Sequence, residues 1–371
     1  MTNKSVLNTG IRNARNVSRY LYGQGAIADL AMILADRRST STTAPAVFFV
    51  DSFFELNGLP QKLDAVAHDD HVIYVDTTNE PTTDQINRLR NQLEEACKVP
   101  PCAIVGIGGG VTMDVAKAVS NLLTNRGNAE DYQGWDLVKL PGIFKIAIPT
   151  ISGTGAESTR TCVMTNPVNG LKLGMNSDFT VYDQIILDPD LTGTVPHNQY
   201  FYTGMDAYIH CMESLGGSYR NAIGDAYSDQ TMRLCRDVFL GDAMMSDENR
   251  AKLMVASYLG GCAIATSYVG VVHPFSAGLS VVLGTHHCVA NCMTMRAMEQ
   301  FYPEGYREFW QMAEHQGVVI PEGICRNLTD EQHDRLYAAT VVHQKPLTNA
   351  LGENYKDILT REKVREIFLK M

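Results

Sequence analysis

Short apolar runs alternate with amphipathic segments through the first part of the chain. Four runs are rich in Val, Ile or Phe and short enough for buried strands, over residues 47–50, 72–75, 103–107 and 143–148. Between them, apolar positions recur at helical spacing over Ile86–Ala96 and Met113–Leu123. This alternation predicts a parallel sheet with helices on both faces and a ligand crevice at the carboxyl ends of the strands. We therefore expect this half to bind a nucleotide-like ligand.

The pattern changes after the segment L-D-P-D-L. From Tyr200 onward, apolar residues recur at helical spacing with few alternating β-branched runs, over residues 200–215, 222–239, 248–267 and 289–301. The sequence therefore predicts two domains, an α/β domain over residues 1–192 and an all-α domain over residues 193–371.

Composition narrows the class of protein. The 371 residues include 41 acidic and 31 basic side chains, a formal net charge of −10, without a dense Lys/Arg block. Nucleic acids and anionic membranes bind clustered positive charge, so this pattern excludes both and favours a small-molecule ligand. Nine cysteines without metal-knuckle spacing predict reduced thiols in a cytoplasmic protein. No apolar run reaches the ~18 residues of a membrane helix, and residues 1–20 contain no apolar signal-peptide core.

Two glycine-rich loops follow predicted strands. The first, G-I-G-G-G-V-T-M-D-V-A-K over Gly106–Lys117, opens into a helix whose free N–H groups suit a pyrophosphate. It matches neither the dinucleotide fingerprint nor the P-loop, so a tight strand-to-helix turn is the alternative. The second, P-T-I-S-G-T-G-A-E-S-T over Pro149–Thr159, offers hydroxyls and amides to a nicotinamide or ribose, or forms a polar turn.

A metal constellation is the third candidate. Asp206 and His210 lie four residues apart, which places them one turn apart on one helix face. Such a pair also occurs as a helix-surface ion pair. His273 and His287, both near the ends of helical segments, strengthen the metal hypothesis. One Asp and three His suit Fe(II) or Zn(II), with an open position for a substrate oxygen.

The order of these motifs resembles one family over nearly the whole chain. Y-G-Q-G-A-I is followed by G-G-G-x-x-x-D-x-A-K, S-G-T-G-x-E, L-D-P-D-L and G-M-D-A-x-x-H. This series is similar to the metal-dependent, often iron-containing, alcohol dehydrogenases, which share a fold with glycerol dehydrogenase and dehydroquinate synthase. The resemblance implies an α/β domain with a parallel sheet that binds NAD(P), an all-α metal-binding domain, and a possible homodimer.

The resemblance also assigns residues to the cofactor. Gly108, Gly109 and Gly110 would hold the pyrophosphate, and Asp114 would lie at the start of the following helix. The hydroxyls of Thr150, Ser152 and Thr154 would line the ribose side. Asp51, directly after a predicted strand, falls where the family often has an acidic residue facing the adenosine ribose. A carboxylate there accepts hydrogen bonds from a 2′-hydroxyl and repels a 2′-phosphate, which favours NAD over NADP. The alternative for Asp51 is a strand-end turn residue.

Asp206, His210, His273 and His287 fall on the family's four metal-ligand positions. The family separates its last two histidine ligands by fourteen residues, which selects His287 over His286. Asn291 fits the family's usual asparagine.

Two departures concern the proton path. The family commonly has H-x-x-x-H at the third ligand, but this chain has Ala277 at the second position, and it has H-H-C where the family has P-H-G. We therefore expect the substrate proton to leave through water, with His286 as a candidate catalytic partner.

The activity that follows is oxidation of an alcohol to an aldehyde or ketone. The metal would lower the pKa of the substrate hydroxyl, and NAD would accept the hydride. The segment from His273 to Cys288 resembles a branch that oxidises the C8 primary alcohol of 3-deoxy-manno-octulosonate, a sugar acid of lipopolysaccharide. Arg160, Lys172 and Lys252 are candidate partners for its carboxylate, and the alternative for each is a solvated surface charge. Other sugar or polyol alcohols, a dehydroquinate synthase-like lyase and a non-catalytic nucleotide or metal sensor are the alternatives.

Overall fold

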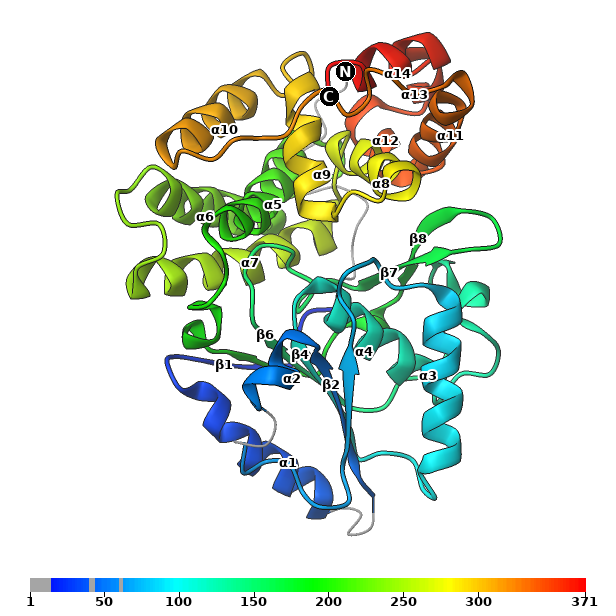
Figure 1. The fold of residues 1–371 in the computed structure, drawn as a ribbon, viewed down its shortest axis with the longest axis vertical. Helices are drawn as coiled ribbons and strands as arrows, with labels where there is room; N and C mark the ends of the chain where they lie inside the picture. Colours follow the sequence, from blue (N-terminus) through cyan, green and yellow to red (C-terminus); the bar gives the residue numbers. More distant parts are fainter. Residues whose placement is uncertain (1–14, 40–43, 60–62) are drawn as a thin grey trace. The chain divides into compact units, whose positions relative to one another are not determined.

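The computed structural model describes residues 15–39, 44–59 and 63–371, which form two compact units (Figure 1). The α/β unit contains Arg15–Ile151 and Ala156–Thr194, and the helical unit contains Ser152–Gly155 and Val195–Met371. The tetrapeptide Ser152–Gly155 therefore belongs to the helical unit, although a boundary at residue 192 places it in the first domain.

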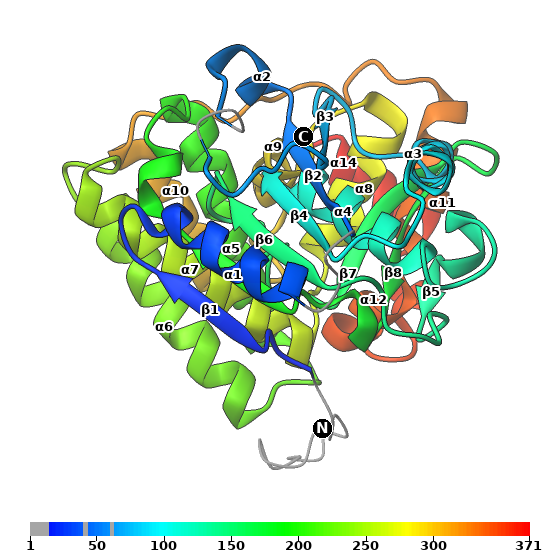
Figure 2. The same cartoon turned by 90° about the horizontal axis from the view of Figure 1, so that it is seen from below.

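The α/β unit is built on a six-stranded sheet in the order β1-β9-β6-β4-β2-β3, and every pair in it is parallel. Figure 2 shows β2, β4 and β6 side by side. The strands are β1 Arg19–Tyr22, β2 Ala46–Asp51, β3 His71–Val75, β4 Ala103–Gly108, β6 Lys145–Pro149 and β9 Gln184–Leu187. The four predicted strands are β2, β3, β4 and β6. The sequence did not predict β1 or β9. Three of the four β1 residues are exposed at the sheet edge, and β9 is only four residues long.

Helices cover both faces of this sheet. On one face, Leu30 and Leu34 of α1 (Leu30–Ser39) join a core with alternate residues of β2 and β4. On the other face lies α4 (Gly110–Leu122), since a Cβ added at Gly106 of β4 would lie 3.2 Å from Ala116. The remaining α-helices of this unit are α2 Phe53–Asn57 and α3 Thr83–Ala96. A smaller three-stranded sheet contains β5 Gly134–Trp135, β7 Thr161–Asn166 and β8 Leu171–Asn176. The predicted parallel α/β architecture is confirmed.

The helical unit packs around a core that includes Phe201, Phe239 and Phe309. Its helices are α5 His197–Gly216, α6 Ala222–Phe239, α7 Asp247–Ser267, α8 Val272–Leu283, α9 His287–Thr294, α10 Pro303–His315, α11 Asp330–Val341, α12 Gln344–Leu351, α13 Tyr355–Ile358 and α14 Arg361–Phe368. The predicted helix over 289–301 is α9 followed by a 3₁₀ turn, Met295–Ala297. Met295 and Met298 remain buried after α9 ends, so apolar spacing does not mark its end.

Glycine makes the S-G-T-G loop fit against two helices. Gly153 has φ +143°, and an added Cβ would lie 1.5 Å from the carbonyl oxygen of Thr203 in α5. Gly155 has φ +62°, and an added Cβ would lie 2.6 Å from the Cα of Gly261 in α7. The Gly155 N–H also donates to Ser257 Oγ at 3.2 Å. Only glycine tolerates both the backbone conformation and this approach, so the loop is tied to the backbones of α5 and α7.

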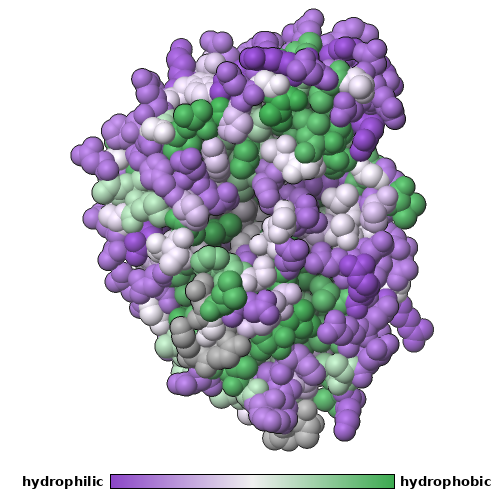
Figure 3. Space-filling view, in the orientation of Figure 1, coloured by the Kyte–Doolittle hydropathy of each residue, from purple (hydrophilic) through white to green (hydrophobic). Residues whose placement is uncertain are grey.

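Hydrophilic residues cover most of the face drawn in Figure 3, and hydrophobic residues gather in smaller patches. No single helix among the described residues is long and apolar enough to cross a membrane. Taken together, α7 and α8 have the length and apolar composition of a membrane span, but the chain bends by 105° between them. Much of both helices is buried within the protein itself. All nine cysteines are free thiols, as their spacing predicts.

Candidate functional site

Three helices of the helical unit bring the four predicted metal ligands together. Asp206 and His210 lie one turn apart on α5, and both are buried. His273 is the second residue of α8, and His287 is the first residue of α9. The two helix N-termini therefore present imidazoles to one face of α5.

The donor atoms converge on the Asp206 carboxylate. Oδ1 of Asp206 lies 3.5 Å from Nε2 of His210 and 3.3 Å from Nε2 of His273, and Oδ2 lies 3.7 Å from Nε2 of His287. Candidate donor atoms of Asp206, His210 and His273 all lie within 4.8 Å of one another. Metal–ligand bonds of ~2.0–2.2 Å separate donors around one ion by roughly 3–3.6 Å. Asp206, His210 and His273 therefore fit a divalent ion, and His287 lies at the other oxygen of the same carboxylate.

Charge is distributed unequally over this cluster. Burial by itself raises the pKa of Asp206, but the imidazoles outweigh it and hold this pKa well below its ordinary value. Burial lowers the pKa of His210 to about 3, so its ring is neutral at pH 7. Burial also acts to lower the pKa of His273, but the Glu213 and Asp206 carboxylates raise it to about 9. A neutral His210 and an ionised Asp206 are the forms that bind a cation.

Two further residues complete the cluster. Asn291 of α9 donates through Nδ2 to Oδ1 of Asp206 at 2.7 Å, in line with the family's usual asparagine. Glu213 of α5, which the sequence analysis missed, is bonded to Nδ1 of His273. Its spacing places it on the ligand-bearing helix face, because Asp206, His210 and Glu213 recur at i, i+4 and i+7, but does not assign its partner.

The adjacent histidines have different environments. His286 is the residue before α9 and is exposed, whereas Nε2 of His287 lies at the Asp206 carboxylate. This geometry agrees with the fourteen-residue spacing. Ala277 lies one turn after His273 on α8 and is buried.

The first glycine-rich loop is a strand-to-helix connection in the α/β unit. Gly108 ends β4, Gly109 precedes α4 and Gly110 begins it. Thr150 extends the adjacent strand, since its N–H donates to the Gly108 carbonyl at 3.0 Å. The first N–H groups of α4 have no partner within the helix itself, and a helix N-terminus of this kind is suited to a phosphate.

Asp51 lies beside this loop at the end of β2. A Cβ added at Gly108 would lie 3.1 Å from Cβ of Asp51. Oδ1 of Asp51 accepts hydrogen bonds from Phe53 N at 3.0 Å and Thr77 Oγ1 at 3.3 Å, and burial raises the pKa of the carboxyl. Asp51 is thus a strand-end turn residue and also a neighbour of the proposed pyrophosphate loop.

Asp114 lies in the helix that follows the glycine-rich loop, where it makes a contact that the sequence did not predict. Its Oδ2 accepts a hydrogen bond from Val163 N of β7 at 2.9 Å, and burial raises its pKa to about 7. On the same helix, Nζ of Lys117 donates to the carbonyls of Thr159 and Thr161 at 2.9 and 2.8 Å. These side chains attach α4 to β7, so the structure shows Asp114 in a structural contact.

The hydroxyl residues of the second loop divide between the two units. Thr150 belongs to the α/β unit, whereas Ser152 and Thr154 belong to the helical unit. Ser152 is 2% exposed, and within the part of the chain that the structure describes its Oγ has no hydrogen-bond partner. A buried hydroxyl without a partner suits a ligand atom.

The three basic residues considered for a substrate carboxylate bind the protein's own carboxylates. Arg160 pairs with Asp178 at 3.2 Å and with Asp136. Lys172 pairs with a glutamate at 2.9 Å, and Lys252 does so at 2.8 Å. The expectation that one of them binds substrate therefore has no support in the structure.

Comparison with known proteins identifies the family. The profile "Iron-containing alcohol dehydrogenase" matches residues 17–189, and the profile "Fe-containing alcohol dehydrogenase family, C-terminal" matches residues 200–344. Sulfoacetaldehyde reductase of Bilophila wadsworthia is 35% identical over 221 residues, 59% of this chain and 56% of that protein. NAD-dependent methanol dehydrogenase of Bacillus methanolicus is 28% identical over 280 residues, 74% of this chain and 71% of that protein. The match to the first of these relatives thus spans little more than half of its length.

Solved structures share the fold over almost the whole chain. A 1,3-propanediol oxidoreductase superposes with a TM-score of 0.80 at 21% identity, over 96% of this chain and 98% of that one. Sulfoacetaldehyde reductase from Bifidobacterium kashiwanohense, in complex with NAD+, gives a TM-score of 0.78 at 21% identity, over 96% and 97%. The two profiles, which together span most of the sequence, confirm the resemblance seen in the motifs, and the chain belongs to the iron-containing alcohol dehydrogenase family.

Proposed function

We propose that this protein interconverts an alcohol and its aldehyde or ketone, with a divalent metal ion and NAD. The observation that supports this most directly is the convergence of three imidazoles on the buried Asp206 carboxylate. When bound, the ion lowers the pKa of the substrate hydroxyl and NAD accepts the hydride from the carbon that bears it. Family membership favours iron, and the proposed cofactor is NAD because Asp51 is acidic.

The chain's own residues have distinct tasks in this scheme. Asp206 provides the negative charge of the binding site, and Asn291 holds one of its oxygens through a 2.7 Å hydrogen bond. His210 is neutral and can bind a cation at pH 7. The N-terminus of α4 would hold the pyrophosphate, and the Ser152 hydroxyl would be available to the cofactor or substrate.

The proposed substrate is a small alcohol or aldehyde. The relatives are named for sulfoacetaldehyde, methanol and 1-propanol. The sugar acid 3-deoxy-manno-octulosonate, expected from the His273–Cys288 segment, is the second candidate. Like sulfoacetaldehyde, it carries an anionic group. The test is a screen of both anions and of simple alcohols with Fe(II)- and Zn(II)-loaded protein, following NADH and oxygen. Absence of nicotinamide turnover with every compound would favour the sensor alternative, and cyclisation of a phosphorylated sugar acid would favour the lyase.

Asp51 is expected to set cofactor preference. Asp51→Ala should lower the NAD/NADP affinity ratio about tenfold, because a charged hydrogen bond to the ribose is worth roughly 1.5 kcal/mol or more. Fluorescence titration with NADH and NADPH measures the ratio. Asp69→Ala is the control, since that carboxylate is 96% exposed just before β3, at the opposite end of the strands. An unchanged ratio in Asp51→Ala would leave Asp51 as a turn residue only.

The exposure of His286 favours a water path for the substrate proton. His286→Ala should therefore reduce turnover less than tenfold and leave the pH–rate profile unaltered. A general base would instead cost ~10²-fold or more and remove an inflection near the histidine pKa. Loss of that inflection would establish His286 as the relay, and Ala277→His is the complementary variant because a relay restored there would rescue His286→Ala.

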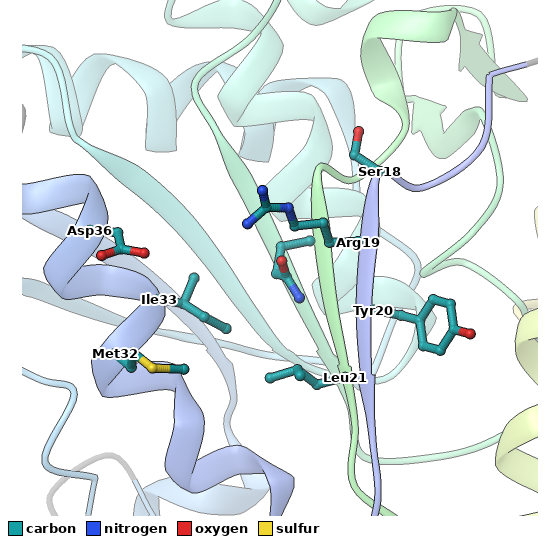
Figure 4. Close-up of a pocket in the computed structure, with 8 residues that line it drawn as sticks. Ser18, Arg19, Tyr20, Leu21, Met32, Ile33 and Asp36 are labelled. Atoms are coloured by element: carbon teal, nitrogen blue, oxygen red, sulfur yellow. The ribbon is translucent and has the colours of Figure 1, made fainter.

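A homodimer and a cytoplasmic location stay predictions. Within the described residues β1 is an edge strand of the six-stranded sheet, and Tyr20 on this strand is 62% exposed. Figure 4 shows Tyr20 pointing away from α1, opposite to Arg19 and Leu21. A cavity of about 420 Å³ lies between β1 and α1. Light scattering of the purified protein decides between a monomer and a dimer.

A further inference from the structure

Glu213 lies behind the metal-binding face of His273. It is on α5, seven residues after Asp206, and its side chain is fully buried. Oε1 accepts hydrogen bonds from Val272 N at 2.6 Å and His273 N at 3.4 Å. Oε2 pairs with Nδ1 of His273. One carboxylate thus holds both the backbone at the start of α8 and the imidazole ring.

Three N–H groups converge on these two oxygens. A carboxylate accepts all of them because it has no donor of its own. A glutamine of the same shape has one acceptor oxygen and one NH₂ group. Whichever way that amide is turned, its NH₂ faces an N–H, either on the backbone at Val272 and His273 or at Nδ1 of the ring. Only a carboxylate at position 213 therefore accepts hydrogen bonds from all three N–H groups.

The contact also determines which ring nitrogen of His273 is available. With its proton on Nδ1 and directed at Glu213, the ring turns the lone pair of Nε2 toward Oδ1 of Asp206, 3.3 Å away. His210 differs, because within the described residues its Nδ1 has no hydrogen-bond partner. A carboxylate behind a ligand imidazole orients the ring and raises its basicity.

Charge balance points to the same role. Asp206 and Glu213 are both buried, and among the described residues their ion-pair partners are histidines, without a Lys or Arg. Two buried carboxylates without a Lys or Arg beside them are unfavourable unless another positive charge neutralises them. A divalent cation bound by neutral imidazoles neutralises both.

We propose that Glu213 is a positioning residue of the metal centre, which holds His273 as the Nδ1–H tautomer and supplies the second negative charge that a divalent cation neutralises. This inference rests on the metal centre of the proposed function. It concerns metal binding, so it can be tested without knowing the substrate.

The first test compares the Zn²⁺ and Co²⁺ affinities of the wild-type protein and Glu213→Gln by competition with a chromophoric chelator. We expect Glu213→Gln to bind each ion 10–100-fold more weakly. Glu308→Gln is the matched control, because Glu308 of α10 is partly buried and bonds Tyr208 on the same helix α5. Its metal affinity should stay within threefold of the wild type.

Equal affinities in Glu213→Gln and Glu308→Gln would overturn the inference while leaving the metal centre in place. Absence of metal binding by the wild type would instead overturn the proposed function and this inference together.

The second test needs no variant and applies even if Glu213→Gln does not fold. Histidine-selective ¹⁵N labelling of the Zn²⁺-loaded protein reports the tautomer of each ring through its two-bond proton–nitrogen couplings. We expect His273 to carry its proton on Nδ1. A His273 resonance with the proton on Nε2, or with both nitrogens protonated, would contradict the proposal.

Discussion

His287→Ala should lose most of its bound metal, while His286→Ala keeps a full complement. Nε2 of His287 lies 3.7 Å from the Asp206 carboxylate, whereas His286 is exposed before the first turn of α9. Removing a ligand should weaken binding by more than the ~10–100-fold that loss of a hydrogen-bond partner behind a ligand produces. Turnover should fall with it, because in the proposed function a bound ion would lower the pKa of the substrate hydroxyl.

The two variants form a matched pair, since both delete an imidazole at adjacent positions of one helix N-terminus. Metal content after dialysis, measured by plasma mass spectrometry, decides the result. A His286→Ala protein that loses its metal while His287→Ala keeps it would refute the fourteen-residue spacing. The corresponding changes at His210 and His273 should resemble His287→Ala, because these imidazoles lie at the same carboxylate.

Gly153→Ala should destabilise the helical unit by about 2–5 kcal/mol, the sum of a positive-φ backbone penalty and overpacking. Its added Cβ would lie 1.5 Å from the carbonyl oxygen of Thr203. That atom belongs to backbone in the middle of α5, so no side-chain rotation relieves the clash. Thr203 lies one turn before Asp206, and movement of α5 should therefore reduce metal binding as well.

The control for this prediction is Gly170→Ala. Gly170 lies between β7 and β8, has φ +66° and would have nothing within 4 Å of its added Cβ. Gly170→Ala should lower the free energy of unfolding only by the backbone penalty of about 1–2 kcal/mol. Urea unfolding curves of both variants measure the difference, provided that the slopes agree. A cost for Gly153→Ala no greater than that for Gly170→Ala would show that the S-G-T-G loop moves away from α5 without strain.

Periodicity predicts elements well where burial is continuous. Strands β2, β4 and β6 are buried along nearly all of their length, and helix α6 has the same bounds, Ala222–Phe239, as its apolar pattern. Periodicity fails where an element is exposed or short. β1 lies at a sheet edge, and the 3₁₀ turn after α9 continues the apolar spacing although the helix has ended.

The resemblance to the family predicted the four metal ligands, because the family's motifs preserve the intervals between them. Asp206 and His210 share a helix face, and the fourteen-residue interval identifies His287. Glu213 lies on the same face, but a single carboxylate at helical spacing carries no ligand chemistry by itself. Its function depends on the packing of α8 against α5, which brings Nδ1 of His273 to it.

The sequence by itself determined the alternation of strands and helices and the change from mixed to helical periodicity near residue 192, because these depend on local spacing and composition, and its ordered motifs carried the resemblance that identified the family and predicted four metal ligands. Only the tertiary structure decided that Asp114 contacts β7, that Ser152–Gly155 packs with the helical unit and that Glu213 holds His273. Each of these contacts joins residues that are distant in sequence, and the physical reason is the same. A side chain or backbone amide acquires its partner only when two elements pack together, and that packing leaves no periodic trace along the chain.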